Sequence, residues 1–352
     1  MKKNFLYLWT FFIVTILVMV GFNFFREAPK RETILDKVIS IPEKLVANVP
    51  YLPPFCEEIP SNFKKGFVEI EDGELYYEEE GQGIPVVLIN GGPGNTHHIF
   101  HPHFSRINDM ARVIYYDQRG TGKSSSDETE KTYTVKQAVD DLESLRKALK
   151  IDKWTVLGFS YGGFLAQFYA LNYPNNCSGL ILVSSGIKWP STEKNPCAYD
   201  PRLLKFVSQK EFDAINDISR RADEGLLSAS QRIYNNNLSG YWKSERYYKP
   251  TPKEFIRRAL YEWSPAPNFR ETMLKEIYKI SFEGKFNKFK IPTLIARGKW
   301  DFLWFNSTFE SSKKNYPNAR VKFFEKSGHL LFADEPEKFF KILKKFLKEE
   351  IE

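Results

Sequence analysis

Short apolar runs that alternate with helical patterns constrain the fold of this chain more than any other feature. The runs PVVLIN, ARVIYYD, KWTVLGFS and GLILVSS each read as a strand that is buried on both faces. Between the second and the third, TYTVKQAVDDLESLRKALK has apolar residues at helical spacing, and GFLAQFYALNYP after the third is helical and stopped by a proline. Strands alternating with helices predict a mostly parallel sheet with helices on both faces.

A hairpin precedes this alternation, and one long segment interrupts it. FVEIEDGELYYEEEG alternates around Asp72-Gly73, a strong two-residue turn signal, and predicts a β-hairpin. From about residue 187 to 288 the chain is helix-like and rich in Tyr, Trp, Arg and Lys, before IPTLIARG, RVKFFEK and a last helix from Glu335 resume the alternation. We therefore predict an α/β core in two parts, residues 66–186 and 289–352, with an inserted helical cap at 187–288.

The sequence GFSYGG lies between a predicted strand and a predicted helix, the context in which G-x-S-x-G is meaningful. Glycines two positions to either side of Ser160, Gly158 and Gly162, allow a strained turn that lifts its hydroxyl above the sheet. A serine hydroxyl needs a base, and that base must itself be oriented. His329 in KSGHLLF and Asp301 in RGKWDFLW follow late strands in the chain order expected for such a triad. Ser160, Asp301 and His329 are therefore the candidate catalytic residues.

A tetrahedral intermediate also needs hydrogen-bond donors for its oxyanion. One donor should be the backbone N–H of Tyr161, the residue after the candidate nucleophile. The other should come from the loop after an early strand, where Asn90-Gly91-Gly92-Pro93-Gly94 follows PVVLIN, and Gly92 is the best candidate. A plain glycine turn is the alternative interpretation of that loop.

The stretch DQRGTGKSSS looks like the end of a nucleotide-binding phosphate loop. That pattern, Gly-x-x-x-x-Gly-Lys-Ser/Thr, would require glycine at position 117, where this chain has Asp117, whose carboxylate would repel a phosphate. The net charge of +7 is modest, and no basic stripe is interleaved with aromatic residues. We predict neither a nucleotide nor a nucleic acid as partner.

The three cysteines, Cys56, Cys177 and Cys197, form no short-spaced pair and have no His partners at metal-ligand spacing. We therefore predict no metal site and no organic cofactor.

NGGPG, DQRGTGKSS, GFSYGG, an Asp after the penultimate strand and a Gly-His after the last resemble, in this order, the α/β-hydrolase superfamily and its proline iminopeptidase branch of serine peptidases. The resemblance covers about Phe67 to the end. It implies an α/β-hydrolase fold, and it implies that Asp117 and Arg119 brace the site, with the Arg119 guanidinium tying loops together by charge-assisted bonds. The family usually has His where this chain has Asn90, the outer support of the oxyanion loop.

A second departure from the family concerns the amine of the substrate. Aminopeptidases of this branch use cap glutamates, often in a Trp-Glu-Gly context, which this chain lacks. A desolvated ammonium still needs a carboxylate, and Glu262 in LYEWSP is the nearest candidate. The alternative is that Glu262 is an ordinary exposed glutamate on a helix.

An uncharged run from Asn4 to Phe25 is about as long as a helix needs to be to cross a bilayer. It is longer than the apolar core of a cleaved signal peptide and lacks a small-x-small site after it, although a cleaved signal and a buried core helix are alternatives. We expect an N-terminal transmembrane anchor at residues 1–30 and a proline-containing linker at 31–65. This predicts a single-pass membrane protein, bound to the lipid bilayer, with its catalytic domain on the non-cytoplasmic side, although charges flank both ends of the run.

These features predict a membrane-anchored serine hydrolase that works through an acyl-enzyme, and the resemblance implies that it releases an N-terminal residue from short peptides. An esterase or lipase that acts on acyl esters would use the same triad and needs no amine pocket. A catalytically idle hydrolase fold that serves as a binding module is a third reading. The substrate is expected to be a small peptide or an ester.

Overall fold

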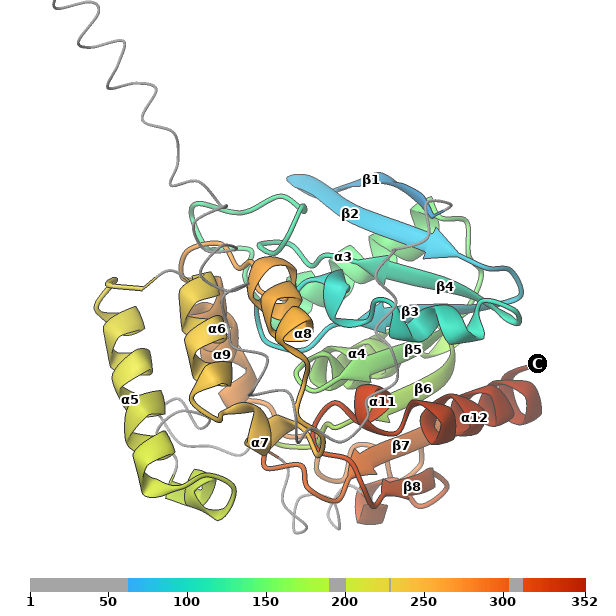
Figure 1. The fold of residues 1–352 in the computed structure, drawn as a ribbon. Coiled ribbons are helices and arrows are strands. Elements are labelled where there is room, and N and C mark those ends of the chain that lie inside the picture. Colours follow the sequence, from blue (N-terminus) through green and yellow to red (C-terminus); the bar gives the residue numbers. More distant parts are fainter. Residues whose placement is uncertain (1–62, 190–200, 228, 304–312) are drawn as a thin grey trace, which may run out of the picture. The chain divides into compact units, whose positions relative to one another are not determined.

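The structure is a computed structural model, and it describes residues 63–189, 201–227, 229–303 and 313–352. An eight-stranded sheet lies at the centre of these residues, in the order β1-β2-β4-β3-β5-β6-β7-β8 (Figure 1). The first two pairings, β1 with β2 and β2 with β4, are antiparallel, and all the others are parallel. The predicted mostly parallel sheet is thus confirmed. The strands are β1 (Lys64–Ile70), β2 (Gly73–Glu80), β3 (Ile84–Ile89), β4 (Ala111–Tyr116), β5 (Trp154–Phe159), β6 (Cys177–Val183), β7 (Thr293–Gly298) and β8 (Arg320–Phe324).

The hairpin of β1 and β2 turns at Glu71-Asp72, one residue before the predicted Asp72-Gly73 pair, and Gly73 is the first residue of β2. The register pairs Ile70 with Gly73, and Asp72 has a φ of 56°. Asp tolerates this left-handed backbone better than most residues do, because its short polar side chain can bond locally. The turn chemistry therefore sets the register of the edge strands.

Helices cover both faces of the sheet (Figure 1). Val87 and Ile89 of β3 belong to one apolar core, together with residues of α3 and α4. Val86 and Leu88 belong to a second core with residues of α12. The two sets alternate along the strand, as the two-residue period of β-structure requires. The helical elements outside the cap are η2 (His97–Ile99), η3 (His103–Ile107), α3 (Val135–Ala148), α4 (Gly162–Asn172), η4 (Pro174–Asn176), α11 (Leu331–Asp334), α12 (Pro336–Phe346) and η7 (Leu347–Ile351).

The described residues from η5 (Pro201–Lys205) to α9 (Phe269–Tyr278), between β6 and β7, are mostly helical, and we call them the cap. No strand interrupts them in the ranges that the structure describes. Two isolated bridges, Asn95 with Trp263 and Thr121 with Pro265, join the cap to loops of the core. The boundaries predicted for anchor, linker, core and cap stay predictions. The cap contains η5 (Pro201–Lys205), α5 (Gln209–Asp223), α6 (Ala229–Leu238), α7 (Trp242–Glu245), α8 (Pro252–Arg257), η6 (Arg258–Glu262) and α9 (Phe269–Tyr278).

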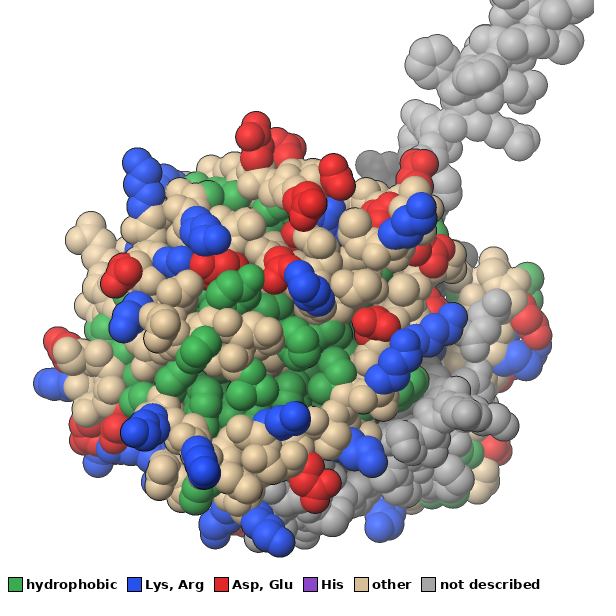
Figure 2. Space-filling view, turned by 180° about the vertical axis from the view of Figure 1, so that it is seen from behind, with side chains coloured by type: hydrophobic (Ala, Val, Ile, Leu, Met, Phe, Trp, Pro, Cys, Tyr) green, Lys and Arg blue, Asp and Glu red, His purple; other side chains and the backbone are tan. Residues whose placement is uncertain are grey.

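The surface shown in Figure 2 carries mixed charge. Lys and Arg side chains are interspersed with Asp and Glu around a patch of hydrophobic side chains, and they form no continuous basic stripe on this face. This distribution matches the modest net charge of the chain.

The predicted membrane localisation needs correction. In the part of the chain that the structure describes, no helix has the length and the apolar character needed to cross a bilayer. The run at residues 4–25, on which the prediction of an anchor rests, lies outside the described residues. The single-pass topology, the contact with a lipid bilayer and the non-cytoplasmic placement of the catalytic domain are therefore withdrawn.

Candidate active site

Ser160 occupies a strained turn between β5 and α4. Its φ of 54° lies in the left-handed region, which is costly for a residue with a side chain. Glycines make the turn sterically feasible: a Cβ on Gly158 would lie 2.3 Å from the carbonyl oxygen of Gly162, and one on Gly162 would lie 2.2 Å from the carbonyl oxygen of Ile89. Strand and helix can therefore cross closely only without side chains there, and Ser160 is held at the carboxyl edge of the sheet.

His329 and Asp301 meet at the ends of the last two strands. Nδ1 of His329 lies 3.0 Å from Oδ2 and 3.1 Å from Oδ1 of Asp301. The Asp301 side chain is fully buried and that of His329 is nearly so. Since a carboxylate can only accept, Nδ1 carries the proton and Nε2 is left as an acceptor. The pair thus has the tautomer that a general base requires.

The backbone around His329 is fixed from two sides. Its N–H donates to the carbonyl oxygen of Glu245 in the cap at 2.6 Å, and its own carbonyl accepts from Ser184 Oγ at 2.6 Å. Gly328 packs so closely that a Cβ there would lie 2.5 Å from the same Glu245 oxygen. Core and cap therefore both position the imidazole.

A buried cation lies near the Asp301 carboxylate. Burial lowers the pKa of the Arg297 guanidinium to about 10, while the negative charge of Asp301 opposes this shift. Arg297 remains charged at neutral pH, so it offsets part of the negative charge that is buried behind His329.

The glycine loop after β3 passes beside the candidate nucleophile. A Cβ on Gly91 would lie 3.2 Å from Cβ of Ser160. Within the described residues, the N–H groups of Gly92 and Tyr161 donate to no protein acceptor. Two unengaged backbone donors next to a serine hydroxyl can bind an oxyanion.

Side-chain bonds hold this loop in place. Asn90 is fully buried; its Nδ2 donates to the carbonyl oxygen of Asn95, and its Oδ1 accepts from Gln118 Nε2 at 3.1 Å. The amide of Asn90 therefore closes the loop on itself and links it to the turn after β4. This is where the resemblance to the hydrolase family leads one to expect His.

Asp117 organises the GTGKS turn, which wraps around this carboxylate. Asp117 accepts from the backbone N–H groups of Lys123 and His97, each at 2.9 Å. Gly122 packs so tightly that a Cβ would lie 2.2 Å from the Asp117 carboxylate. The glycine and lysine that suggested a phosphate loop thus serve to enclose a buried side chain.

Arg119 joins three separate parts of the core. Its Nε and Nη2 donate to the two carboxylate oxygens of Asp141 on α3, at 2.8 and 2.9 Å. The same guanidinium also donates to the carbonyl oxygens of Glu71 and Asp72 at the hairpin turn. The bidentate pair fixes the turn after β4 against the hairpin and α3.

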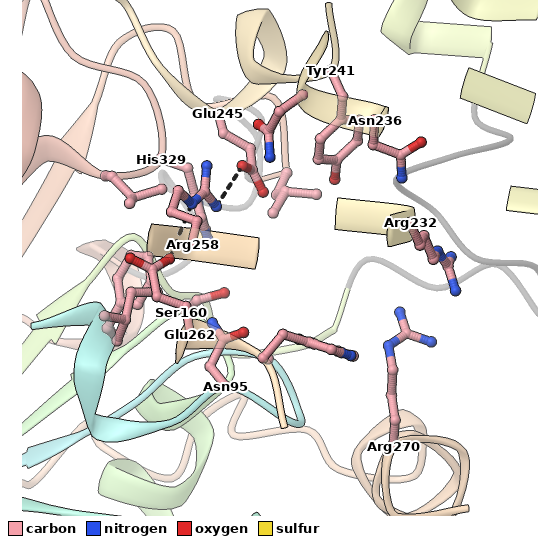
Figure 3. Close-up of a pocket in the computed structure, with 17 residues that line it drawn as sticks. Asn95, Ser160, Arg232, Asn236, Tyr241, Glu245, Arg258, Glu262, Arg270 and His329 are labelled. Atoms are coloured by element: carbon pink, nitrogen blue, oxygen red, sulfur yellow. Dashed lines mark hydrogen bonds and ion pairs between the residues drawn. The ribbon is translucent and has the colours of Figure 1, made fainter. Parts of the chain in front are cut away.

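A cavity between core and cap contains Ser160 and His329 in its wall (Figure 3). The core contributes mainly apolar or backbone surface, whereas the cap contributes charged and amide side chains. Its lining residues are Gly92, Asn95, Ile99, Phe159, Ser160, Arg232, Asn236, Asn237, Tyr241, Glu245, Arg258, Glu262, Trp263, Arg270, Leu303, His329 and Leu330.

Glu262 is part of this cavity wall. It is only 4% exposed, so it is not the surface glutamate of the alternative interpretation. Its Oε2 accepts from Arg258 Nε at 3.0 Å, and its Oε1 pairs with Arg257. Arg258 also donates to Oε2 of Glu245 at 3.0 Å. The cap therefore places two buried or half-buried carboxylates around one guanidinium.

Sequence reasoning missed Glu245 and the cavity arginines Arg232, Arg258 and Arg270. They belong to no motif, and only the packing of the cap helices brings them to one cavity. The one sequence signal was general, namely the wealth of Arg and aromatic residues between residues 187 and 288.

Comparison with known proteins agrees with this geometry. Residues 84–336 match the family described as the alpha/beta hydrolase fold. The chain belongs to this family. The resemblance to its proline iminopeptidase branch is confirmed by the curated relatives, and the chain is accordingly a serine hydrolase.

Two of these relatives are similar over most of their length. A proline iminopeptidase of Saccharolobus solfataricus is 29% identical over 296 residues, which cover 81% of this chain and 93% of the relative. A proline iminopeptidase of Lactobacillus crispatus is 30% identical over 292 residues, covering 78% and 94% of the two chains.

Solved structures share the fold. The proline iminopeptidase of Mycobacterium smegmatis superposes with a TM-score of 0.61 at 21% identity, covering 82% of this chain and 98% of that one. An esterase from Exiguobacterium antarcticum gives a TM-score of 0.62 at 23% identity, covering 81% and 100%. At these identities the likeness shows the fold alone.

Proposed function

We propose that the chain is an aminopeptidase of the proline iminopeptidase type, which releases the N-terminal residue of short peptides through an acyl-enzyme. Ser160 attacks the scissile carbonyl, and His329 takes its proton and passes it to the leaving amine. Asp301 orients His329 and stabilises the imidazolium that forms. The N–H groups of Gly92 and Tyr161 hold the oxyanion.

The observation that carries this proposal is the presence of Glu245 and Glu262 in the same cavity as Ser160. In an N-terminal residue, the ammonium is only two bonds from the scissile carbonyl carbon, so its binding groups must lie in the cavity of the nucleophile. An ammonium that leaves water needs a carboxylate partner. Arg258 orients both carboxylates and leaves them further lone pairs with which to accept from the substrate.

Arginines in another part of the cavity wall are suited to bind the C-terminal end of a short peptide. Arg232 and Arg270 extend toward one another in Figure 3. Among the described residues, Arg270 forms no ion pair, and its guanidinium lies 6.0 Å from the ring centre of Trp263. A planar guanidinium is well matched to a carboxylate. We therefore assign this region to the free C-terminal carboxylate of the peptide.

An esterase that acts on acyl chains would use the same serine and the same oxyanion donors. It would leave Glu245 and Glu262 without a role toward the substrate. The two functions differ in whether a free amine is required, and this difference decides the experiment.

The test compares three chromogenic substrates: prolyl p-nitroanilide, its N-acetylated form and p-nitrophenyl butyrate. We expect kcat/KM for the free-amine anilide to exceed that for the acetylated form by on the order of 100-fold, because a buried carboxylate loses its partner in the latter. Hydrolysis of the butyrate alone would identify an esterase. No turnover of any substrate and no labelling of Ser160 by a fluorophosphonate would identify an idle hydrolase fold.

A further inference from the structure

A buried group of three side chains, two of which come from the segment after the oxyanion loop, takes no part in the proposed reaction. Glu78 comes from β2, and His97 and His101 come from η2 and the turn after it. They are 6%, 1% and 2% exposed. One candidate ligand atom from each can be chosen so that all three lie within 4.8 Å of one another.

The spacing of these atoms suits a shared cation. Oε1 of Glu78 lies 3.5 Å from Nε2 of His97, and Oε2 lies 3.2 Å from Nε2 of His101. Two ligand atoms bound to a tetrahedral zinc ion at about 2.0–2.1 Å are themselves roughly 3.3 Å apart. The two separations between Glu78 and the histidines therefore match those of metal ligands.

Several of these atoms lack a hydrogen-bond partner within the described chain. Nε2 of His97, both ring nitrogens of His101 and Oε2 of Glu78 are buried and unsatisfied. Although Nε2 of His101 and Glu78 are close, they form no aligned hydrogen bond. Buried polar atoms are almost always paired, so a group of unpaired ones that face each other needs an explanation.

Neighbouring side chains orient the members of the cluster, as outer contacts orient the ligands of a metal ion. Asp117 Oδ1 lies 2.8 Å from Nδ1 of His97, which leaves Nε2 as the ligand atom, and Tyr76 donates its hydroxyl to Glu78 Oε1 at 2.5 Å. Such outer contacts orient ligands and fix the tautomer of a histidine. The ring of His101 stacks on Tyr115 with centroids 4.1 Å apart.

The negative charges buried around the cluster also favour a metal ion there. Glu78 and Asp117 are both buried carboxylates, and an imidazole that binds a metal ion through Nε2 is neutral. One divalent cation would balance the two negative charges, which are otherwise expensive to bury.

We propose that Glu78, His97 and His101 bind a divalent transition-metal ion, with Zn²⁺ the best match to two imidazoles and one carboxylate. A water molecule would complete the tetrahedron. The ion would join β2 to the segment after the oxyanion loop, so its role is structural. This departs from the sequence prediction of no metal, which considered the spacing of cysteines.

The test uses the full chain, produced without a histidine tag and supplied with ZnCl₂, and measures bound metal after gel filtration by mass spectrometry. We expect about one Zn²⁺ per chain in the wild type and less than about a tenth of that in Glu78→Gln and His101→Gln. The control is His103→Gln, a histidine of the same segment outside the cluster, which should keep the wild-type content. Circular dichroism reports whether each variant is folded.

A second measurement does not depend on the variants. Unfolding of the wild type should shift to higher temperature as the Zn²⁺ concentration rises, because a ligand that binds only the folded state stabilises it. Another first-row metal at the same stoichiometry, lost in the same two variants, would also support the site. A folded wild type that holds no stoichiometric metal after incubation with excess ZnCl₂, or a His101→Gln variant with undiminished metal, would overturn the proposal.

Discussion

Nδ1 of His329 lies 3.0 Å from Oδ2 of Asp301, although the two residues are 28 positions apart in the chain. Each residue follows a strand, Asp301 after β7 and His329 after β8, and these strands are parallel neighbours. Parallel strands end at the same edge of the sheet, so the loops that follow them meet there. The pairing is thus a consequence of topology.

Removal of the proposed nucleophile should abolish catalysis. We expect Ser160→Ala to lower kcat on prolyl p-nitroanilide by on the order of 10⁴–10⁶-fold, since no other group can form the acyl-enzyme. Ser178→Ala is a matched control, because Ser178 is not among the residues that line the cavity. Its Oγ lies 3.2 Å from Thr155 Oγ1 on the neighbouring strand. Steady-state kinetics measures both, and unchanged turnover in Ser160→Ala would contradict the proposed mechanism.

Loss of the carboxylate that orients the base should be nearly as severe. Asp301→Asn keeps the size of the side chain but offers an NH₂ group to Nδ1, which favours the wrong tautomer of His329. We expect kcat to fall by about 10³–10⁴-fold while the folded structure persists. A loss smaller than tenfold, with a native circular dichroism spectrum, would exclude this role for Asp301.

The cap carboxylates should act on the amine of the substrate alone. In Glu262→Gln and Glu245→Gln, we expect kcat/KM for free-amine anilides to fall by about 10–100-fold, the equivalent of one charge-assisted hydrogen bond. Hydrolysis of p-nitrophenyl butyrate should change much less. Glu271→Gln alters an exposed glutamate of α9 and serves as control. An equal loss on both substrates would point to a structural role of these carboxylates.

The proposed carboxylate site predicts a preference among peptides. For the wild type, kcat/KM should be higher for a tripeptide with a free C-terminus than for its amide, and Arg270→Gln should reduce this difference by about tenfold. Arg221→Gln, at an exposed position of α5, should leave the ratio unchanged. Release of the N-terminal residue is followed by chromatography. If the wild type treats acid and amide alike, the assignment of Arg270 fails.

A buried ion-pair group between cap and core should make stability depend on acid pH. Arg246 Nε donates to Asp334 at 2.7 Å and also pairs with Glu254. Burial alone would raise the pKa of the Glu254 carboxyl, but the charge of Arg246 outweighs burial and holds this pKa below its ordinary value of 4.5.

Because the pKa of Glu254 is lower in the folded state, its contribution to stability is complete above pH 4.5 and is lost as the pH falls through the folded-state pKa. Glu254→Gln should therefore be less stable than the wild type at pH 7, and the gap should shrink below pH 4.5. Urea unfolding at several pH values measures this. A gap that stays constant down to pH 3 would mean that ionisation of Glu254 contributes nothing.

The sequence predicts the sheet and the triad because their signals are local. Each strand is a short apolar run, and Ser160, Asp301 and His329 each follow one, so that topology alone brings them to one edge. The cap residues that line the cavity have no such local signal. Glu245 and Arg270 reach the cavity through the packing of helices on helices, which leaves no motif, and burial of Glu262 depends on arginines that compensate its charge.

The cluster of Glu78, His97 and His101 could be predicted only in part from the sequence. His97 and His101 can be recognised in the sequence because they lie four positions apart. Their partner Glu78 lies on β2, and the pairing of that strand decides whether its side chain faces them. A search for metal ligands along the sequence alone cannot foresee that meeting.

The carbonyl oxygen of Glu245 receives the N–H groups of both His329 and Leu330. Displacement of α7 from the sheet would therefore break two hydrogen bonds to the backbone segment that carries the imidazole of His329. A displaced α7 and a fixed His329 imidazole therefore exclude each other. A cap taken from another protein would have to place a backbone carbonyl at this position for the imidazole to stay fixed.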